Sequence, residues 1–214
     1  MKLPTQAELH RAASGFDADW GGLDEVLYGI CSRSPGHSVR RDVTAKIALI
    51  DRAYSAGMER CVTPPPGEQA IGVITDFVCE NAAEVDEIIA CLAPLKEPLD
   101  IAAMVEIVGL HGRFTTLLRQ VTTDGKTPRS FAAKYLHFHN PVVPIYDSYA
   151  AARLGKLVRW DPREIPFAQP PGGDAEYWGF CVRFFRLYDA CRAVGLAASV
   201  KTLDTYLFTV PVAK

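Results

Sequence analysis

Apolar residues recur at helical spacing along most of the chain. The clearest case is segment 38–58, where Val39, Val43, Ile47 and Ile50 are spaced by four, four and three residues. At about 100° per residue these positions share one face of a helix, and the charged side chains fall largely on the opposite face. The pattern predicts a single amphipathic helix over 38–58.

Capping residues, prolines and glycines mark the ends of further helices. Asp17 or Asp19 can cap the first of them, Asn81 precedes an acidic helix, and Thr127 stands before a proline at a first helical position, where a missing N–H costs nothing. No alternating pattern is long enough for a sheet, so we expect an all-α fold of at least seven helices. The expected segments are 17–32, 82–92, 98–108, 114–121, 130–139, 148–158, 174–193 and 201–208.

The length of 214 residues is typical of one domain. We expect a compact multi-helix unit over 1–214, with lobes 1–97 and 98–214 around a cleft. Segment 160–173 holds four of the fifteen prolines and is the best candidate for a linker or lid.

Composition excludes several classes of protein. With 49% apolar and 22% charged residues, the chain is neither disordered, collagen-like nor a coiled coil. No stretch approaches the roughly 18 apolar residues that a membrane span needs. The N-terminus lacks the apolar core of a signal peptide, so we expect a cytoplasmic protein without a membrane partner.

The six cysteines are spread along the chain without a C-x-x-C pair. Zinc ribbons and four-cysteine iron–sulfur sites need tighter pairing of their ligands. A disulfide framework is typical of secreted chains. We therefore expect reduced, mostly buried cysteines, no metal and no cofactor.

Charge is divided unevenly between two segments. Residues 68–106 contain nine acids and one base, a sum of −8, whereas residues 112–160 contain eight bases and two acids, a sum of +6. The basic segment suits a polyanion, so nucleic acid is the expected partner. The alternative is that the two segments face each other or form solvated helix surfaces. The candidate nucleic-acid-binding residues are Arg113, Arg129, Arg153, Lys156 and Arg159.

Segment 130–150 carries the most informative pattern. Lys134 stands in an otherwise apolar helix, beside Phe131 and Tyr135. Such a lysine either extends its stem to solvent or is partly desolvated, which lowers its pKa and supplies an amine nucleophile. Asp147 opens the next helix, where a carboxylate is first of all an N-cap. Two interpretations remain open at this point. Either Asp147 is only a helix cap and Lys134 is solvated, or the two residues form a catalytic pair.

His137 and His139 form an H-x-H pair in the same segment. On a continuous helix the two side chains diverge by about 200° and cannot bind one metal ion. A two-histidine site completed by Asp147 needs the helix to end early. Histidines that satisfy ordinary hydrogen bonds are the simpler interpretation.

The order of these features resembles the helix-hairpin-helix DNA glycosylase superfamily. A helix with Lys134, a proline-bounded turn, an apolar stretch and Asp147 opening another helix follow one another as in that family. The family's lysine attacks the sugar of a damaged nucleotide, and its aspartate assists loss of the base. The resemblance covers residues 98–160 and implies that Lys134 and Asp147 are catalytic, in an all-α fold with two lobes around a cleft. TPRSFAAK stands where the family has a hairpin such as L-P-G-V-G.

Three hypotheses about function follow. The first is a base-excision enzyme, similar to a DNA N-glycosylase, in which Lys134 and Asp147 act on a flipped nucleotide. The second is a nucleic-acid-binding module on the same scaffold, without chemistry. The third is a helical protein-interaction domain that presents its acidic face to a basic partner. The aromatic residues that can stack on bases, with a place as anchors of the core as the simpler interpretation, are Tyr135, Tyr146, Trp160 and Trp178.

Overall fold

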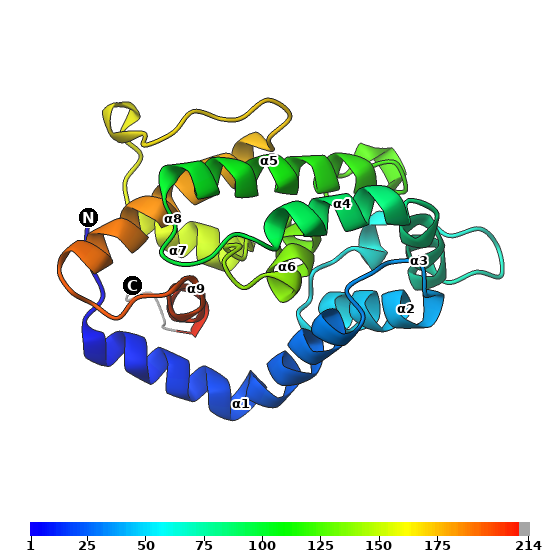
Figure 1. Cartoon of the computed structure of the whole chain (residues 1–214), viewed down its shortest axis with the longest axis horizontal. Coiled ribbons are helices and arrows are strands. Elements are labelled where there is room, and N and C mark those ends of the chain that lie inside the picture. The colour runs from blue at the N-terminus through cyan, green and yellow to red at the C-terminus, as the bar shows by residue number, and fades with distance from the viewer. Residues whose placement is uncertain (210–214) are drawn as a thin grey trace.

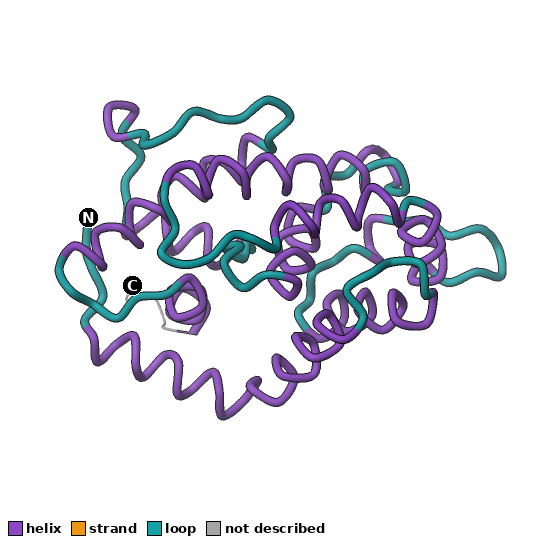
Figure 2. Tube along the Cα trace, in the orientation of Figure 1, coloured by secondary structure: helices purple, strands orange, loops and turns teal. Residues whose placement is uncertain are grey.

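The computed structural model describes residues 1–209, which form nine α-helices and no β-strand (Figures 1 and 2). The expectation of an all-α fold is confirmed. The helices are α1 (Gln6–Arg33), α2 (Arg40–Ala48), α3 (Ala70–Glu80), α4 (Ala82–Leu92), α5 (Ile101–Leu118), α6 (Arg129–His139), α7 (Ser148–Leu157), α8 (Ala175–Ala193) and α9 (Val200–Thr209).

Helix α1 is the longest helix of the described residues and begins eleven residues before Asp17, the first of the two caps predicted for it. Its N-cap is Thr5, whose side chain accepts the Glu8 N–H while the Glu8 carboxylate accepts the Thr5 N–H. This reciprocal capping box is a stronger start signal than an isolated aspartate. α1 runs along one edge of the molecule and packs against α9 and α6 (Figure 1).

The helix expected over 38–58 ends early. The α-helical part, α2, ends at Ala48, and a π-helical turn, Leu49–Ala53, follows it directly. The cause is Asp51, a buried carboxylate that accepts the N–H groups of Met58 at 2.5 Å and Glu59 at 3.0 Å. These bonds fold the chain back through Ser55, which adopts a left-handed conformation with φ of 49°. Residues 53–60, called loop 53–60 below, therefore leave the α-helix and connect the end of the π-helical turn to a short 3-10 helix, Glu59–Cys61.

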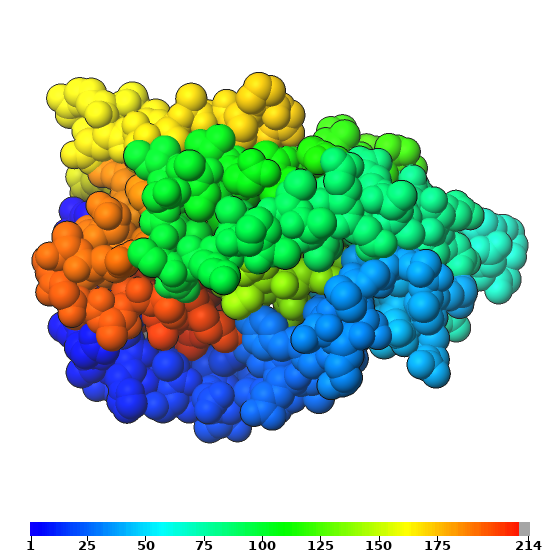
Figure 3. Space-filling model, viewed as in Figure 1, coloured from blue at the N-terminus to red at the C-terminus, as the bar shows by residue number. Residues whose placement is uncertain are grey.

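Helix α5 is continuous where two separate helices were expected. Gly109 and Gly112 lie inside it, and ten of its residues are buried. It is the one helix of residues 1–209 long and apolar enough to cross a membrane by length and composition. A Cβ at position 112 would collide with the backbone of Gly172 and Gly173. Gly112 thus lets the proline-rich segment 160–173 close onto the helix, along one edge of the molecule (Figure 3).

Helix α6 forms the centre of the core. Every residue from Phe131 to Phe138 is buried, Lys134 and His137 included. Its boundaries, and those of α7, α8 and α9, agree with the expected segments to within two residues. Burying two polar side chains in a central helix requires partners for both. Those partners define the candidate site.

We predict opposite effects of adding a methyl group at the two glycines of α5. Gly112→Ala should lower the free energy of unfolding by about 1–3 kcal/mol, because the new Cβ overlaps segment 160–173. Gly109→Ala, the matched control, meets no atom within 4 Å and should raise the free energy by about 0.5–1 kcal/mol. Urea titrations measure both changes. Equal effects of the two substitutions would contradict the close approach at Gly112.

Candidate functional site

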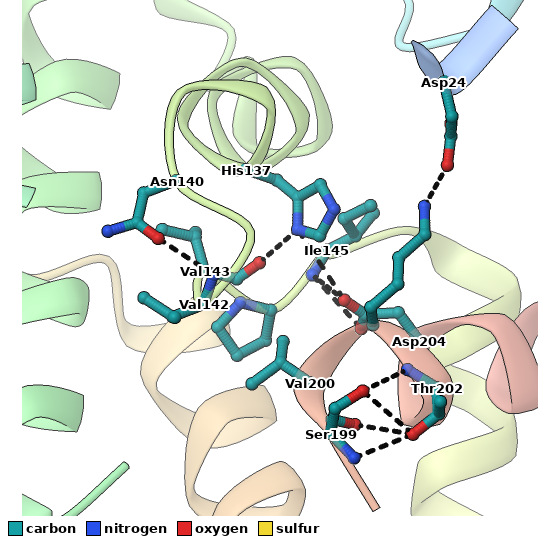
Figure 4. Close-up of polar contacts among 12 residues, drawn as sticks. Asp24, His137, Asn140, Val142, Val143, Ile145, Ser199, Val200, Thr202 and Asp204 are labelled. Carbon is teal, nitrogen blue, oxygen red and sulfur yellow. Dashed lines mark hydrogen bonds and ion pairs between the residues drawn. The ribbon is translucent and has the colours of Figure 1, made fainter. Parts of the chain in front are cut away.

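The turn between α6 and α7 is held by His137, which is fully buried. Its Nδ1–H donates to the Val143 carbonyl at 2.7 Å (Figure 4). The other ring nitrogen, Nε2, therefore accepts the Tyr28 hydroxyl at 2.6 Å. Burial lowers the pKa of His137 to about 4, which keeps the ring neutral in this role. One imidazole therefore connects α6, the turn and α1.

Asn140 stabilises the same turn from its other side. Its Nδ2 donates to the carbonyls of Leu92 and Leu95 at 2.7 and 3.0 Å, and its Oδ1 accepts the Val142 N–H at 3.2 Å. Pro141 stands within the turn and ends α6 at His139. These contacts determine where the start of α7 lies relative to α6.

A cavity of about 680 Å³ opens beside this turn. Its walls come from α1, loop 53–60, the first turns of α6, residues 145–150 and α9. The walls include side chains separated by nearly the whole chain, since Phe16 and Phe208 both border the cavity and contact each other edge to face at 6.5 Å.

Lys134 borders this cavity and is only 6% exposed. Its Nζ donates to the Tyr54 carbonyl at 2.8 Å, where the chain enters the left-handed turn at Ser55. Burial lowers the pKa of Lys134, and the negative charges of Asp147 and Asp51 offset part of that effect. Of the two interpretations that the sequence left open for this lysine, its burial agrees with the desolvated one.

Asp147 borders the same cavity as Lys134. It is the N-cap of α7, and its Oδ1 accepts the Ala150 N–H at 2.7 Å. The positive end of the helix dipole favours a carboxylate at this position. The Asp147 side chain therefore both caps α7 and borders the cavity.

Aromatic side chains of the cavity come mainly from segments that the sequence analysis did not single out. Trp20 packs against Tyr54 at 6.0 Å between ring centroids and is 37% exposed. Among the aromatics expected to stack on bases, Tyr146 borders the cavity and Tyr135 lies in the core. Trp160 packs against Trp178 of α8, and neither tryptophan borders the cavity.

A polar network that the sequence analysis also missed lies behind these aromatics. Asp24 of α1 accepts both the Tyr54 hydroxyl and the Lys201 ammonium. Lys201 of α9 borders the cavity and lies over the Phe16 ring. No local motif marks these residues, because they come together only when α9 packs on α1.

The five predicted nucleic-acid-binding residues lie in different environments. Arg129 borders the cavity but is paired with Asp174 at 2.5 Å and Glu176 at 2.9 Å. Arg113 pairs with Glu87 at 3.2 Å.

The remaining three lie on or near α7. Arg153 is 6% exposed, with its guanidinium 4.4 Å from the Tyr206 ring centroid. Lys156 and Arg159 are exposed. Of the five, these last two present the most accessible positive charge.

The histidine pair does not converge on a metal ion. Both ring nitrogens of His137 are occupied by their bonds to Val143 and Tyr28, and His139 packs against His37 with ring centroids 5.3 Å apart. Over residues 1–209, no three histidine, cysteine or acidic side chains are grouped closely enough to bind a metal. All six cysteines are unbonded thiols.

Comparison with protein-family models, curated proteins and solved structures finds no match for this chain.

We predict that acid destabilises the protein through its buried histidines. Burial lowers the pKa of His37, His111 and His137 to about 4 each, whereas the unfolded chain takes up these protons below about pH 6.5. The free energy of unfolding should therefore fall as the pH is lowered from about 6.5 to 4.

His137→Gln should lower stability at pH 7 and flatten this pH dependence. A shift of this size in one histidine corresponds to about 3 kcal/mol across the window. His10→Gln, which changes an exposed histidine of α1, is the control. Denaturant titrations between pH 7 and 4.5 measure both slopes. The same slope in the two variants would contradict the neutral, buried state of His137.

Proposed function

We propose that the protein is a base-excision enzyme that acts on a nucleotide flipped out of a nucleic-acid strand, with Lys134 and Asp147 as its catalytic residues. The observation that carries the proposal is that a desolvated lysine and a helix-capping carboxylate border one cavity. A flipped base needs such a pocket, because its reacting bond is inaccessible inside a duplex.

Lys134 acts as the nucleophile. Burial favours its neutral amine, whose electron pair forms a bond to the sugar carbon C1′ as the bond from C1′ to the base breaks. The base leaves with the electrons of that bond, and water later hydrolyses the covalent intermediate. The net reaction is hydrolytic removal of a base.

Asp147 stabilises the positive charge that develops on the sugar. Its carboxylate lies on the cavity wall, and its charge acts favourably on a cation near Lys134, as its effect on the pKa of that lysine indicates. The bond from the Ala150 N–H orients the carboxylate without neutralising it. A preoriented charge of this kind needs no reorganisation during the reaction.

The size and lining of the cavity support a nucleotide as substrate. A volume of about 680 Å³ lies within the range of about 300–1,000 Å³ typical of small-molecule sites. Trp20, Tyr54 and Phe208 offer ring faces and edges for a base, and base–aromatic stacking contributes about 1–3 kcal/mol per base. Arg60 also borders the cavity, and its positive charge can bind the phosphate of a flanking nucleotide.

We predict that Lys134 forms a reducible covalent bond with an abasic site. A duplex carrying one abasic site, incubated with the protein and sodium cyanoborohydride, should yield a cross-linked species on a denaturing gel. Lys134→Gln should reduce its yield at least about 100-fold, because the nucleophile is removed. Lys96→Ala, a change at an exposed lysine of the acidic segment, should trap as the wild type does. Trapping that persists in Lys134→Gln would contradict the assignment.

Binding should depend on salt through the exposed cations of α7 and the following residues. The double variant Lys156→Ala, Arg159→Ala should weaken binding to a duplex, and the slope of log K against log salt should fall by about 0.9 for each phosphate that the variant no longer neutralises. Fluorescence anisotropy between 50 and 200 mM salt measures the slope. A wild type without salt-dependent binding would remove nucleic acid as the partner and favour a helical protein-interaction domain.

A further inference from the structure

Asp204 is a second carboxyl on the wall of the candidate cavity. It lies on α9, is 6% exposed and borders the cavity together with Lys134 and Asp147. Its two oxygens share a single backbone donor, the Ile145 N–H, at 3.3 and 3.2 Å (Figure 4). This is sparse solvation for a buried carboxylate, which needs several donors or a cation to remain charged.

The nearest cations are directed elsewhere. Lys201 lies one turn before Asp204 on α9, but its ammonium is bonded to Asp24. The Nδ1 atom of His137 is 3.9 Å from Asp204, and its proton is donated to Val143. In the part of the chain that the structure describes, no lysine or arginine forms an ion pair with Asp204.

Several charged groups act on Asp204 from the elements packed around it. Burial raises its pKa well above the ordinary value, and the charges of Asp147 and Glu97 add to this effect, whereas Lys201 and the Ile145 N–H oppose it. Burial and the single shared donor therefore both favour the protonated form of Asp204 on the cavity wall. The titratable side chains around it are His137 of α6, Asp147 at the start of α7, Lys201 of α9, Tyr28 of α1, Tyr177 and Cys181 of α8, and Glu97 before α5.

We propose that Asp204 is a further catalytic residue, the acid that hydrogen-bonds an acceptor atom of the flipped base and protonates it as the base leaves. This inference rests on the proposed base-excision function. In the step, the Lys134 amine forms its bond to C1′, and the bond from C1′ to the base breaks with its electrons passing to the base. The proton of Asp204 then completes a neutral leaving base and leaves Asp204 as a carboxylate, balanced by the new cationic amine on Lys134.

The two carboxyls of the cavity thereby have separate roles that follow from their surroundings. Asp147 sits at a helix N-terminus, which favours a negative charge beside the sugar. Asp204 lacks such support, so its surroundings favour the protonated form. Pairs of carboxyls in contrasting environments commonly divide acid and charge-stabilising roles in this way. The substrates that need Asp204 are neutral bases, because an alkylated base that is already cationic leaves without a proton.

The experiment compares base release with abasic-site trapping in Asp204→Asn. Duplexes containing uracil, hypoxanthine, 8-oxoguanine or cationic 7-methylguanine are the probes for release under single turnover, and an abasic duplex with cyanoborohydride is the probe for Lys134. Asparagine keeps an acceptor for the Ile145 N–H but has no acidic proton. Release of whichever neutral base the wild type accepts should fall about 100-fold. Trapping, which has no leaving base, should change less than about threefold. Asp189→Asn, on an exposed carboxylate of α8, is the matched control.

The pH dependence gives a second test that needs no variant. Because Asp204 must be protonated to act, wild-type release of a neutral base should decline as the pH rises through its pKa. Trapping should not decline there, because its amine gains nucleophilicity with pH. Normal release by Asp204→Asn, or a wild type without the alkaline decline, would overturn the role of Asp204. A wild type that neither releases any base nor traps an abasic site would instead overturn the proposed function.

Discussion

The candidate site depends on one buried imidazole. His137 donates to Val143 in the α6–α7 turn and accepts from Tyr28 of α1, so a single ring determines how two helices and a turn meet. Lys134 lies one turn before it on α6, and Asp147 lies just beyond the turn it holds. The cavity wall that these two residues share follows from that bridge, together with the bonds of Asn140 that hold the same turn from its other side.

Burial of Lys134 connects stability to the proposed chemistry. An ammonium in a central helix costs free energy, and the bond from Nζ to the Tyr54 carbonyl recovers only part of it. That carbonyl is available because loop 53–60 turns back on the buried carboxylate of Asp51. A strained turn, a buried acid and a desolvated amine therefore belong to one arrangement, and proteins usually retain such costs where a site needs them.

The sequence predicted those parts of the structure whose signals are local. The starts of α7 and α8 follow from Asp147 and Asp174, since each carboxylate caps its helix within one turn. The start of α6 was expected from a Thr127 cap with Pro128 at the first helical position, but Pro128 itself is the N-cap and no side chain caps this helix. The early end of α2 was not predictable, because Asp51 bonds to residues seven and eight positions away after the chain turns back. Likewise, Lys134 and Asp147 stood out in one segment, whereas the opposite wall of the cavity comes from α1 and α9 at the two ends of the chain.

The packing of α9 on α1 closes one side of the cavity on which the proposed function depends. Without α9, Lys134 would have a carbonyl partner and a neighbouring carboxylate but no enclosed volume. α9 supplies one wall of the cavity, and on that wall it places Lys201, which binds Asp24, and Asp204, which has no cation of its own. Because the Lys201 ammonium is bonded to Asp24 of α1, the helix contact that closes the cavity also leaves Asp204 without a paired cation. The contact between α1 and α9 therefore both closes the cavity and favours the protonated form of Asp204.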